Sequence, residues 1–337
     1  MRAFEVRFVR NGGVVEMPEP TISPNDVLVR VAYCGVCGTD LHIFEGEYPA
    51  RLPLVPGHEF SGVVDKIGQR VKHIKVGDRV AVDPNINCGT CYYCRKGMTN
   101  FCEKWEAIGV TRQGAYAELV AAPASNVYRV PRSAPLETFA FVEPVSCVLH
   151  GLDRANPKKG ETALVIGLGT IGLIFGQLLK MRGVKVLGSD LVEHRLRLAK
   201  SVGFDHIVNP AEESTTHAVR SWTAGKGVDL VVEASGSVKA TEEAINLVDK
   251  GGRIVVFGVA PENATLAVRP FALYRDEISL IGSFTNPNTF ATAIKTLSSD
   301  KLSVKDLVSK TVDLGHVETA FEEISLRKGI KYLVKPK

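Results

Sequence analysis

The chain has 337 residues, of which 45% are hydrophobic and 23% are charged, and its formal net charge is +4. This length allows two domains with separate cores, and the nearly balanced charge argues against nucleic acid or an anionic membrane as a partner. The first residues, MRAFEVRFVRNGG, lack the apolar core of a signal peptide, and no run is long enough to span a membrane. Seven cysteines in such a chain predict thiols used as metal ligands in the cytoplasm.

Residues 1–150 are predicted to form mostly short strands separated by turns. Residues 27–35 (VLVRVAYCG) alternate in the strand period, and 60–68 (FSGVVDKIG) and 76–82 (VGDRVAV) follow. Two short segments here carry candidate ligands, Cys37 in CGVCGTDLH and the pair His58-Glu59 in GHEFSG. Taken singly they are weak signals, because a lone cysteine is usually part of a core and an isolated histidine more often satisfies a local hydrogen bond.

A cysteine loop follows, with the spacing C-x2-C-x2-C-x7-C, formed by Cys88, Cys91, Cys94 and Cys102. Four soft thiolates at this spacing fit a tetrahedral ion such as Zn2+, and a closed all-cysteine shell leaves no position for a substrate. Disulfides or four incidental thiols are the alternatives. The loop therefore predicts a structural zinc site, and the chemistry is expected elsewhere.

From about Thr162 the sequence changes to apolar, β-branched runs, most of them separated by helical stretches such as 173–183 and 193–203. The expected strands are 163–166, 184–190, 206–209, 228–234, 253–258 and 278–282. This alternation is typical of an α/β fold with a doubly wound parallel sheet. Beyond it, two helices (289–299 and 317–329) and a closing strand (330–336) are too small to fold alone and are predicted to pack back on the amino-terminal lobe.

The motif G-x-G-x-x-G stands between the first of these strands and the following helix, which is the context that a dinucleotide site requires. Its residues are Gly167, Gly169, Thr170, Ile171 and Gly172, with Leu168 between the first two glycines. Asp190 ends the next strand, where a carboxylate can bind a ribose diol and repel a 2′-phosphate. We therefore expect NAD rather than NADP, although Arg195 weakens this preference. The alternative is a glycine turn without a ligand.

Together, the CGVCGTD segment, G-H-E-x-x-G, the cysteine loop and the GLGTIG turn resemble the zinc-dependent medium-chain dehydrogenases/reductases, the alcohol dehydrogenase superfamily, from Met1 to Lys337. The segment Glu143-Pro144-Val145-Ser146-Cys147 narrows the resemblance to the polyol (sorbitol-like) dehydrogenase branch. It implies a GroES-like, mostly-β catalytic domain (1–150 and 286–337) and a Rossmann NAD-binding domain (151–285). It also implies two zinc ions per chain and a homo-oligomer, either a tetramer or a dimer.

The resemblance further implies a catalytic zinc held by Cys37 and His58, with the carboxylates of Glu59 and Glu143 near it. One carboxylate is expected to ligate directly and the other through water. Thr39 and His42 match the positions of a proton relay; without the motif they would be a turn hydroxyl and a surface imidazole. Cys34 and Cys147 fall off the motif positions and are expected to be buried thiols.

The implied reaction is hydride transfer from a secondary alcohol of a polyol to NAD+. Sorbitol itself is in doubt, because Ile43 replaces an aromatic residue and Thr285 stands where sorbitol-type enzymes carry an arginine. Thr285 and Asn286 are candidate substrate contacts, or simply a turn. Threonine and aldose dehydrogenases share the same motifs, and a nucleotide-binding sensor without turnover is an alternative from another class. A zinc-ribbon nucleic-acid binder is a third option, opposed by the charge.

Overall fold

The computed structural model describes residues 1–299 and 301–337. The chain divides into two compact units. The first comprises Met1–Ser146, Asn286–Asp300 and Val304–Lys337, and the second comprises Cys147–Thr285 and Lys301–Ser303. Among the described residues, no helix has both the length and the apolar character needed to cross a membrane.

Strands dominate the first unit, as the sequence predicts. Its elements are β1 (Arg2–Phe8), β2 (Asn11–Glu16), β3 (Asp26–Gly35), α1 (Gly38–Glu45), β4 (Glu59–Ile67), β5 (Arg79–Val82), β6 (Asn85–Ile86), α2 (Tyr92–Arg95), η1 (Thr99–Phe101), β7 (Glu106–Ala107), β8 (Leu119–Pro123), η2 (Ala124–Asn126), β9 (Val127–Arg129), α3 (Leu136–Phe139), the start of α4 (Val142–Ala155), α10 (Phe290–Leu297), η3 (Lys305–Leu307), β16 (Val308–Val312), η4 (Leu314–His316), α11 (Val317–Ser325) and β17 (Lys331–Val334).

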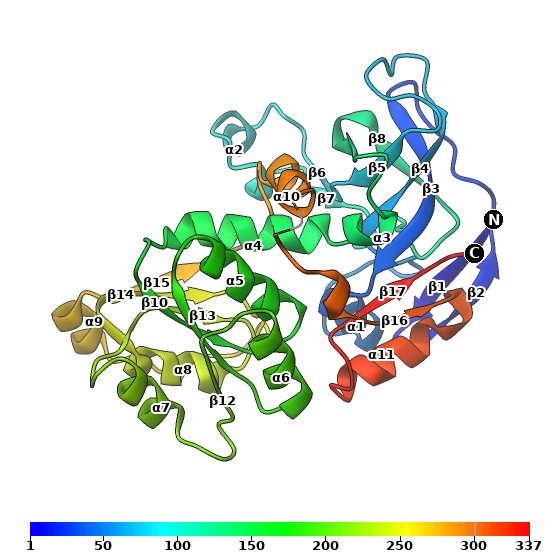
Figure 1. The fold of residues 1–337 in the computed structure, drawn as a ribbon. Coiled ribbons are helices and arrows are strands. Elements are labelled where there is room, and N and C mark those ends of the chain that lie inside the picture. Colours follow the sequence, from blue (N-terminus) through cyan, green and yellow to red (C-terminus); the bar gives the residue numbers. More distant parts are fainter. Residues whose placement is uncertain (300) are drawn as a thin grey trace. The chain divides into compact units, whose positions relative to one another are not determined.

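A sheet ordered β16-β17-β3-β4-β5-β9, with β8 also paired to β3, forms the centre of this unit. Its core contains buried side chains from both ends of the chain, such as Phe4, Val29 and Phe321. Strand β17 pairs antiparallel with β3, and this pairing places Leu333 opposite Gly35. Figure 1 shows this arrangement as red and orange elements beside blue strands. Long-range pairing therefore brings residue 331 next to the segment that precedes Cys37.

The second unit is built on a parallel sheet covered by helices. Its elements, after the end of α4, are β10 (Thr162–Ile166), α5 (Thr170–Met181), β11 (Lys185–Ser189), α6 (Glu193–Ser201), β12 (His206–Val208), α7 (Thr215–Trp222), β13 (Val228–Glu233), α8 (Val238–Leu247), β14 (Val248–Val256), α9 (Pro270–Asp276) and β15 (Ser279–Gly282).

The six strands of this sheet run in the order β12-β11-β10-β13-β14-β15, and every pair is parallel. All six predicted strands are present. The strand order reverses between β10 and β13, and ligands of such sheets bind at this switch point, beyond the carboxyl ends of the strands. The G-x-G-x-x-G turn follows β10 directly, so the predicted nucleotide motif lies at the switch point of this unit.

Candidate functional site

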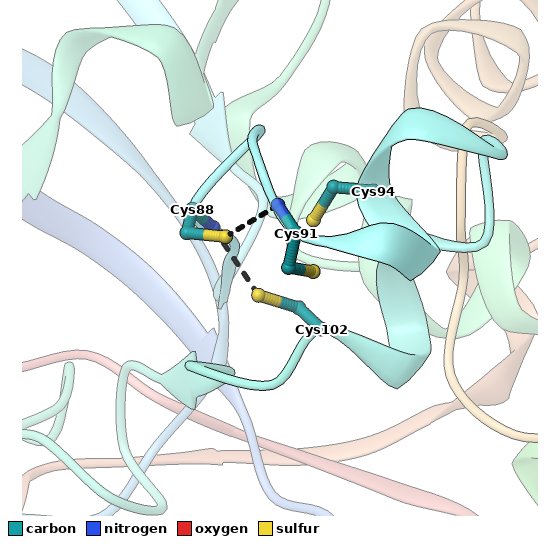
Figure 2. Close-up of side chains that lie close together, drawn as sticks. All are labelled: Cys88, Cys91, Cys94 and Cys102. Carbon is teal, nitrogen blue, oxygen red and sulfur yellow. Dashed lines mark hydrogen bonds between the residues drawn. The ribbon is translucent and has the colours of Figure 1, made fainter.

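The cysteine loop folds back on itself so that its four sulfur atoms converge. The Sγ atoms of Cys88, Cys91, Cys94 and Cys102 all lie within 4.8 Å of one another. Figure 2 shows the four side chains directed toward a common centre. The short helices α2 and η1 position the later cysteines, and β6 and β7 pair at the base of the loop. This convergence fits a tetrahedral metal ion, whose four ligands must surround a single point.

Hydrogen bonds within the loop act differently on its cysteines: they favour the thiolate at Cys88 and Cys91 and the thiol at Cys94. The N–H groups of Cys91 and Cys88 donate to Cys88 Sγ and Cys102 Sγ, each at 3.3 Å. Donors from the backbone and hydroxyl of Thr90, together with the Cys91 N–H, lower the pKa of Cys88 to about 6. Burial and contacts with Cys91 and Cys102 instead raise the pKa of Cys94 to about 12. Several thiolates this close repel one another unless a cation neutralises them, so the donor set fits Zn2+.

A second cluster of donors, from two segments separated by twenty residues of sequence, lies in the same unit. Cys37 caps the start of α1, His58 precedes β4, and Glu59 is the first residue of β4. Their ligand atoms also lie within 4.8 Å of one another. His58 and Glu59 are 7% and 2% exposed, respectively, whereas Cys37 is half-buried. One sulfur, one nitrogen and one oxygen donor fit a zinc ion that keeps a fourth position open.

Asp40 lies directly behind this cluster and is completely buried. Its Oδ2 accepts the Cys37 N–H at 2.9 Å, and its Oδ1 accepts the Gly57 N–H at 3.1 Å and lies 3.3 Å from His58 Nδ1. Burial disfavours charge on His58, but the attraction of Asp40 outweighs it and raises the pKa of His58 well above its ordinary value. The Nδ1 atom faces Asp40, which leaves Nε2 as the ring nitrogen for a metal.

Lys331 is a buried cation beside the same cluster, 2% exposed at the start of β17. It forms an ion pair with Glu59 and donates to the Val36 carbonyl at 3.1 Å. Burial opposes its charge, but Glu59, Cys37 and Glu143 together raise the pKa of Lys331 above its ordinary value. Lys331 therefore supplies a counter-charge to the Glu59 carboxylate, which is also one of the three donors of the cluster.

The remaining predicted residues of this site lie on α1 and α4. The Thr39 Oγ1 atom is 3.7 Å from Cys37 Sγ, and His42, one turn later on α1, has its Nδ1 2.7 Å from Glu47 Oε2. Glu143 is half-buried in the first turn of α4 and acts electrostatically on Lys331. Among the described residues, the compact donor cluster consists of Cys37, His58 and Glu59 and does not include Glu143.

The two off-motif cysteines differ from each other. Cys34 is fully buried, as predicted. Cys147 is only half-buried, so the prediction of a buried thiol is wrong there. Cys147 belongs to a half-buried stripe of α4 that also contains Glu143 and His150, at helical spacing.

The glycine turn of the second unit has the geometry of a phosphate-binding loop. Gly167 has φ +87°, which favours glycine, and a Cβ on Gly172 would lie 1.9 Å from the Gly167 carbonyl oxygen. Gly169 caps α5, whose first residue is Thr170, followed by Ile171. The amino end of α5 thus meets the turn with its backbone N–H groups, which suits a pyrophosphate.

Asp190 follows β11 and is 9% exposed. Its Oδ2 accepts the Leu168 N–H at 2.7 Å, which ties this carboxylate to the glycine turn. Its Oδ1 accepts the Val192 N–H at 2.9 Å, and Arg195 Nη1 lies 3.8 Å from Oδ2. The predicted ribose-binding carboxylate and the predicted arginine therefore lie together beside the turn.

The substrate candidates Thr285 and Asn286 lie where the chain passes from β15 toward α10. Thr285 has φ +54°. Asn286 is 2% exposed, and its amide accepts from Asn85 at 2.6 Å and donates to Ser146 Oγ at 3.1 Å. These bonds give Asn286 a structural role, and its contact with a substrate stays a prediction.

Sequence reasoning did not single out Asp40, Lys331 or Glu233. Asp40 stands inside the quoted CGTD motif, three residues after Cys37, at the spacing that reaches back to a helix cap. Lys331 is the one charged residue of the buried strand β17, which is a signal for a paired buried charge. Glu233 is fully buried at the end of β13 and accepts the Ser235 N–H at 2.7 Å, so it holds the turn opposite Gly167.

Comparison with known proteins agrees with this geometry. Residues 23–132 match the family described as "Alcohol dehydrogenase GroES-like domain", and residues 170–299 match "Zinc-binding dehydrogenase". D-arabinitol dehydrogenase 1 of Uromyces fabae is 36% identical, with 97% of this chain and 95% of the relative covered. A sorbitol dehydrogenase of Halalkalibacterium halodurans is 33% identical, with 96% of this chain and 95% of the relative covered.

Among solved structures, a zinc-binding dehydrogenase from Sinorhizobium meliloti 1021 bound to NADP superposes with a TM-score of 0.96, at 33% identity and 99% coverage of both chains. The chain belongs to the zinc-type alcohol dehydrogenase family, with a GroES-like domain and a Rossmann domain. The sequence motifs predicted a resemblance to the polyol dehydrogenase branch of this family, and the polyol dehydrogenases among the relatives confirm it.

Proposed function

We propose that this protein is a zinc-dependent polyol dehydrogenase that transfers a hydride from a secondary alcohol of its substrate to NAD+, giving a ketose or ketone. The observation that carries the proposal is the Cys37–His58–Glu59 cluster, whose three different donors converge within 4.8 Å. The named relatives, which are arabinitol and sorbitol dehydrogenases, support a polyol over a simple alcohol.

In this proposal the chain binds two zinc ions, one structural at the four-cysteine loop and one catalytic at the mixed cluster. Cys37, His58 and Glu59 would hold the catalytic ion, with Glu143 as the alternative carboxylate. A zinc ion there would act as a Lewis acid that makes the substrate hydroxyl more acidic. Thr39 Oγ1 would accept the hydroxyl proton, and the His42 imidazole would pass it toward solvent, as suits a histidine near neutral pH.

For the cofactor we propose NAD, because the Asp190 carboxylate beside the glycine turn repels a 2′-phosphate. Arg195 lies 3.8 Å from that carboxylate and would attract the same phosphate, so the discrimination is expected to be moderate. Asp190→Ala should lower kcat/KM with NAD and leave or improve it with NADP. An unchanged NAD/NADP ratio would contradict the assigned ribose contact.

The test of the function measures zinc content and NAD or NADP reduction with sorbitol, xylitol, arabitol and a phosphorylated polyol. Threonine, glucose and 2,3-butanediol are included as the competing substrate classes. Turnover confined to polyols, and lost when a chelator removes the second zinc, would support the proposal. Preference for threonine or glucose would favour the alternative dehydrogenases. A chain that holds both zinc ions and binds NADH without any turnover would instead be a nucleotide sensor.

We also propose a cytoplasmic homo-oligomer. Among the described residues no disulfide joins any of the seven cysteines, which suits a reducing compartment. Strand β15 is at the edge of the parallel sheet, with Leu280 exposed on it and with exposed Phe271 and Tyr274 on the preceding helix α9. An apolar sheet edge of this kind is a ready site for pairing with a second copy. Light scattering on wild type and Leu280→Lys would test whether this edge carries the association.

A further inference from the structure

Tyr116 is a fully buried tyrosine that none of the sequence motifs includes. Its segment pairs with the chain just before His58: the Ala115 N–H donates to the Gly57 carbonyl at 2.8 Å, and the Tyr116 N–H donates to the Pro56 carbonyl at 3.0 Å. The ring packs so closely on Gly57 that a Cβ there would lie 2.6 Å from Tyr116 Cδ1. Tyr116 is therefore fixed from two sides beneath the residue that leads into His58.

The Tyr116 hydroxyl donates to Asp40 Oδ2 at 2.7 Å. Burial and the negative charge of Asp40 raise the pKa of this phenol well above its ordinary value, so it remains a donor. The same oxygen accepts the Cys37 N–H, and the other oxygen faces the Gly57 N–H and His58 Nδ1. Each carboxylate oxygen of Asp40 thus has two polar partners, and Tyr116 supplies the one side-chain hydroxyl among these four.

A histidine that binds a metal through one ring nitrogen needs a partner on the other nitrogen, which fixes both its tautomer and the direction of its ring. Asp40 Oδ1, 3.3 Å from His58 Nδ1, is the group placed to be that partner, but a carboxylate free to rotate would fix neither the tautomer nor the ring direction. On the basis of the proposed function, we propose that Tyr116 is a positioning residue for the catalytic zinc. Its hydroxyl locks the Asp40 carboxylate in the plane that holds His58 Nδ1, so that Nε2 is presented next to Cys37.

The test measures zinc affinity at each site separately, by competition with a chromogenic chelator on the folded full-length chain. Cys37→Ala first identifies which of two zinc ions belongs to the mixed cluster. Tyr116→Phe then removes one oxygen atom and keeps the ring on Gly57. We expect it to weaken zinc binding at the mixed cluster about 10-fold, the lower range for a lost outer partner, and to leave the four-cysteine zinc unchanged.

A double-mutant cycle separates action through Asp40 from a general effect. In the Asp40→Asn background, Tyr116→Phe should cause no further loss of zinc affinity, because the carboxylate it acts through is gone. Tyr332→Phe is the matched control, since this buried tyrosine of the same unit bonds to Glu323 instead of Asp40. Tyr332→Phe should leave the zinc affinity of the mixed cluster and of the four-cysteine loop unchanged.

Three results would overturn the inference: unchanged affinity in Tyr116→Phe, an undiminished effect in the Asp40→Asn background, or loss of both zinc ions together with the fold. The last would show that the hydroxyl supports folding and does not specifically position the site. If wild type lacks a second zinc that Cys37→Ala removes, the proposed function fails as well, and that outcome is distinct from the other three.

Discussion

The two cysteine-bearing clusters of the first unit differ in how their charge is balanced. The loop Cys88–Cys102 consists mostly of half-buried thiols close together in sequence, and hydrogen bonds offset their charge. The Cys37–His58–Glu59 cluster is assembled from separate elements and already contains a cation, Lys331, and a second carboxylate, Asp40. The first is a closed site that a metal would complete, whereas the second has buried ion pairs of its own.

Each cluster also has one aspartate near it, and the two aspartates respond to burial in opposite ways. Burial opposes charge on Asp40, but His58 and several donors outweigh it and lower its pKa. Asp83 lies at the base of the cysteine loop among amide groups of Asn85 and Asn286, where burial dominates and raises its pKa to about 6. The mixed cluster is thus accompanied by a charged carboxylate, and the cysteine loop by one that protonates readily.

The largest effect is expected from Cys37→Ala. This change removes one ligand of the mixed cluster and leaves the four-cysteine loop intact. Because a Lewis acid supplies several kcal/mol to this kind of reaction, kcat/KM should fall about 10³-fold. Circular dichroism and the retained structural zinc serve as folding controls. Full turnover in a Cys37→Ala chain would show that the mixed cluster is not the catalytic site.

Lys331→Met tests whether the mixed cluster depends on its built-in cation. The change leaves the Glu59 carboxylate buried without its partner, and losing one member of a buried ion pair typically costs about 3–5 kcal/mol. Denaturant unfolding should show this loss, and Lys331→Arg should restore most of it. Stability within about 1 kcal/mol of wild type would mean that the ion pair contributes little and that the two clusters are less different than their contacts suggest.

Cys91→Ser makes the corresponding change in the cysteine loop, where hydrogen bonds offset the thiolate charge. We expect loss of one zinc ion per chain and a lower melting temperature, because a structural zinc contributes folding free energy directly. Activity at low temperature should be kept better than in Cys37→Ala. A variant that keeps its melting temperature would show that the loop is stable without its metal.

This contrast explains which parts of the site could be predicted from sequence. The four cysteines lie within fifteen positions, so their spacing alone predicts the cluster that the structure shows. The parallel sheet was predictable for a similar reason, since each strand–helix pair is a local pattern. Lys331, in contrast, reaches Glu59 only because β17 returns to β3, and Tyr116 reaches Asp40 through the pairing of its segment with residues before His58. The sequence around Lys331 signals a paired buried charge, but neither it nor the segment around Tyr116 indicates the distant partner.

The smallest effect is expected from Asp83→Asn, which tests the opposite behaviour of the two aspartates. The folded-state pKa of about 6 lies above the ordinary value, so the folded chain binds this proton more tightly than the unfolded chain does. Ionised Asp83 therefore costs stability above pH about 6, and this cost disappears as the pH falls toward the ordinary range of a carboxyl group.

The amide that Asp83→Asn introduces would keep an acceptor oxygen for Asn85 without carrying charge. A pKa difference of this size corresponds to about 3 kcal/mol, and partial solvent access reduces it, so we expect the variant to be about 1–2 kcal/mol more stable at pH about 7.5. Urea unfolding of both chains between pH about 4 and about 7.5, with zinc present, measures the difference, which should narrow as the pH falls below about 6. A gap that is constant with pH would assign the effect to packing, and a destabilised variant would mean that the Asp83 charge supports the loop, as the Asp40 charge supports His58.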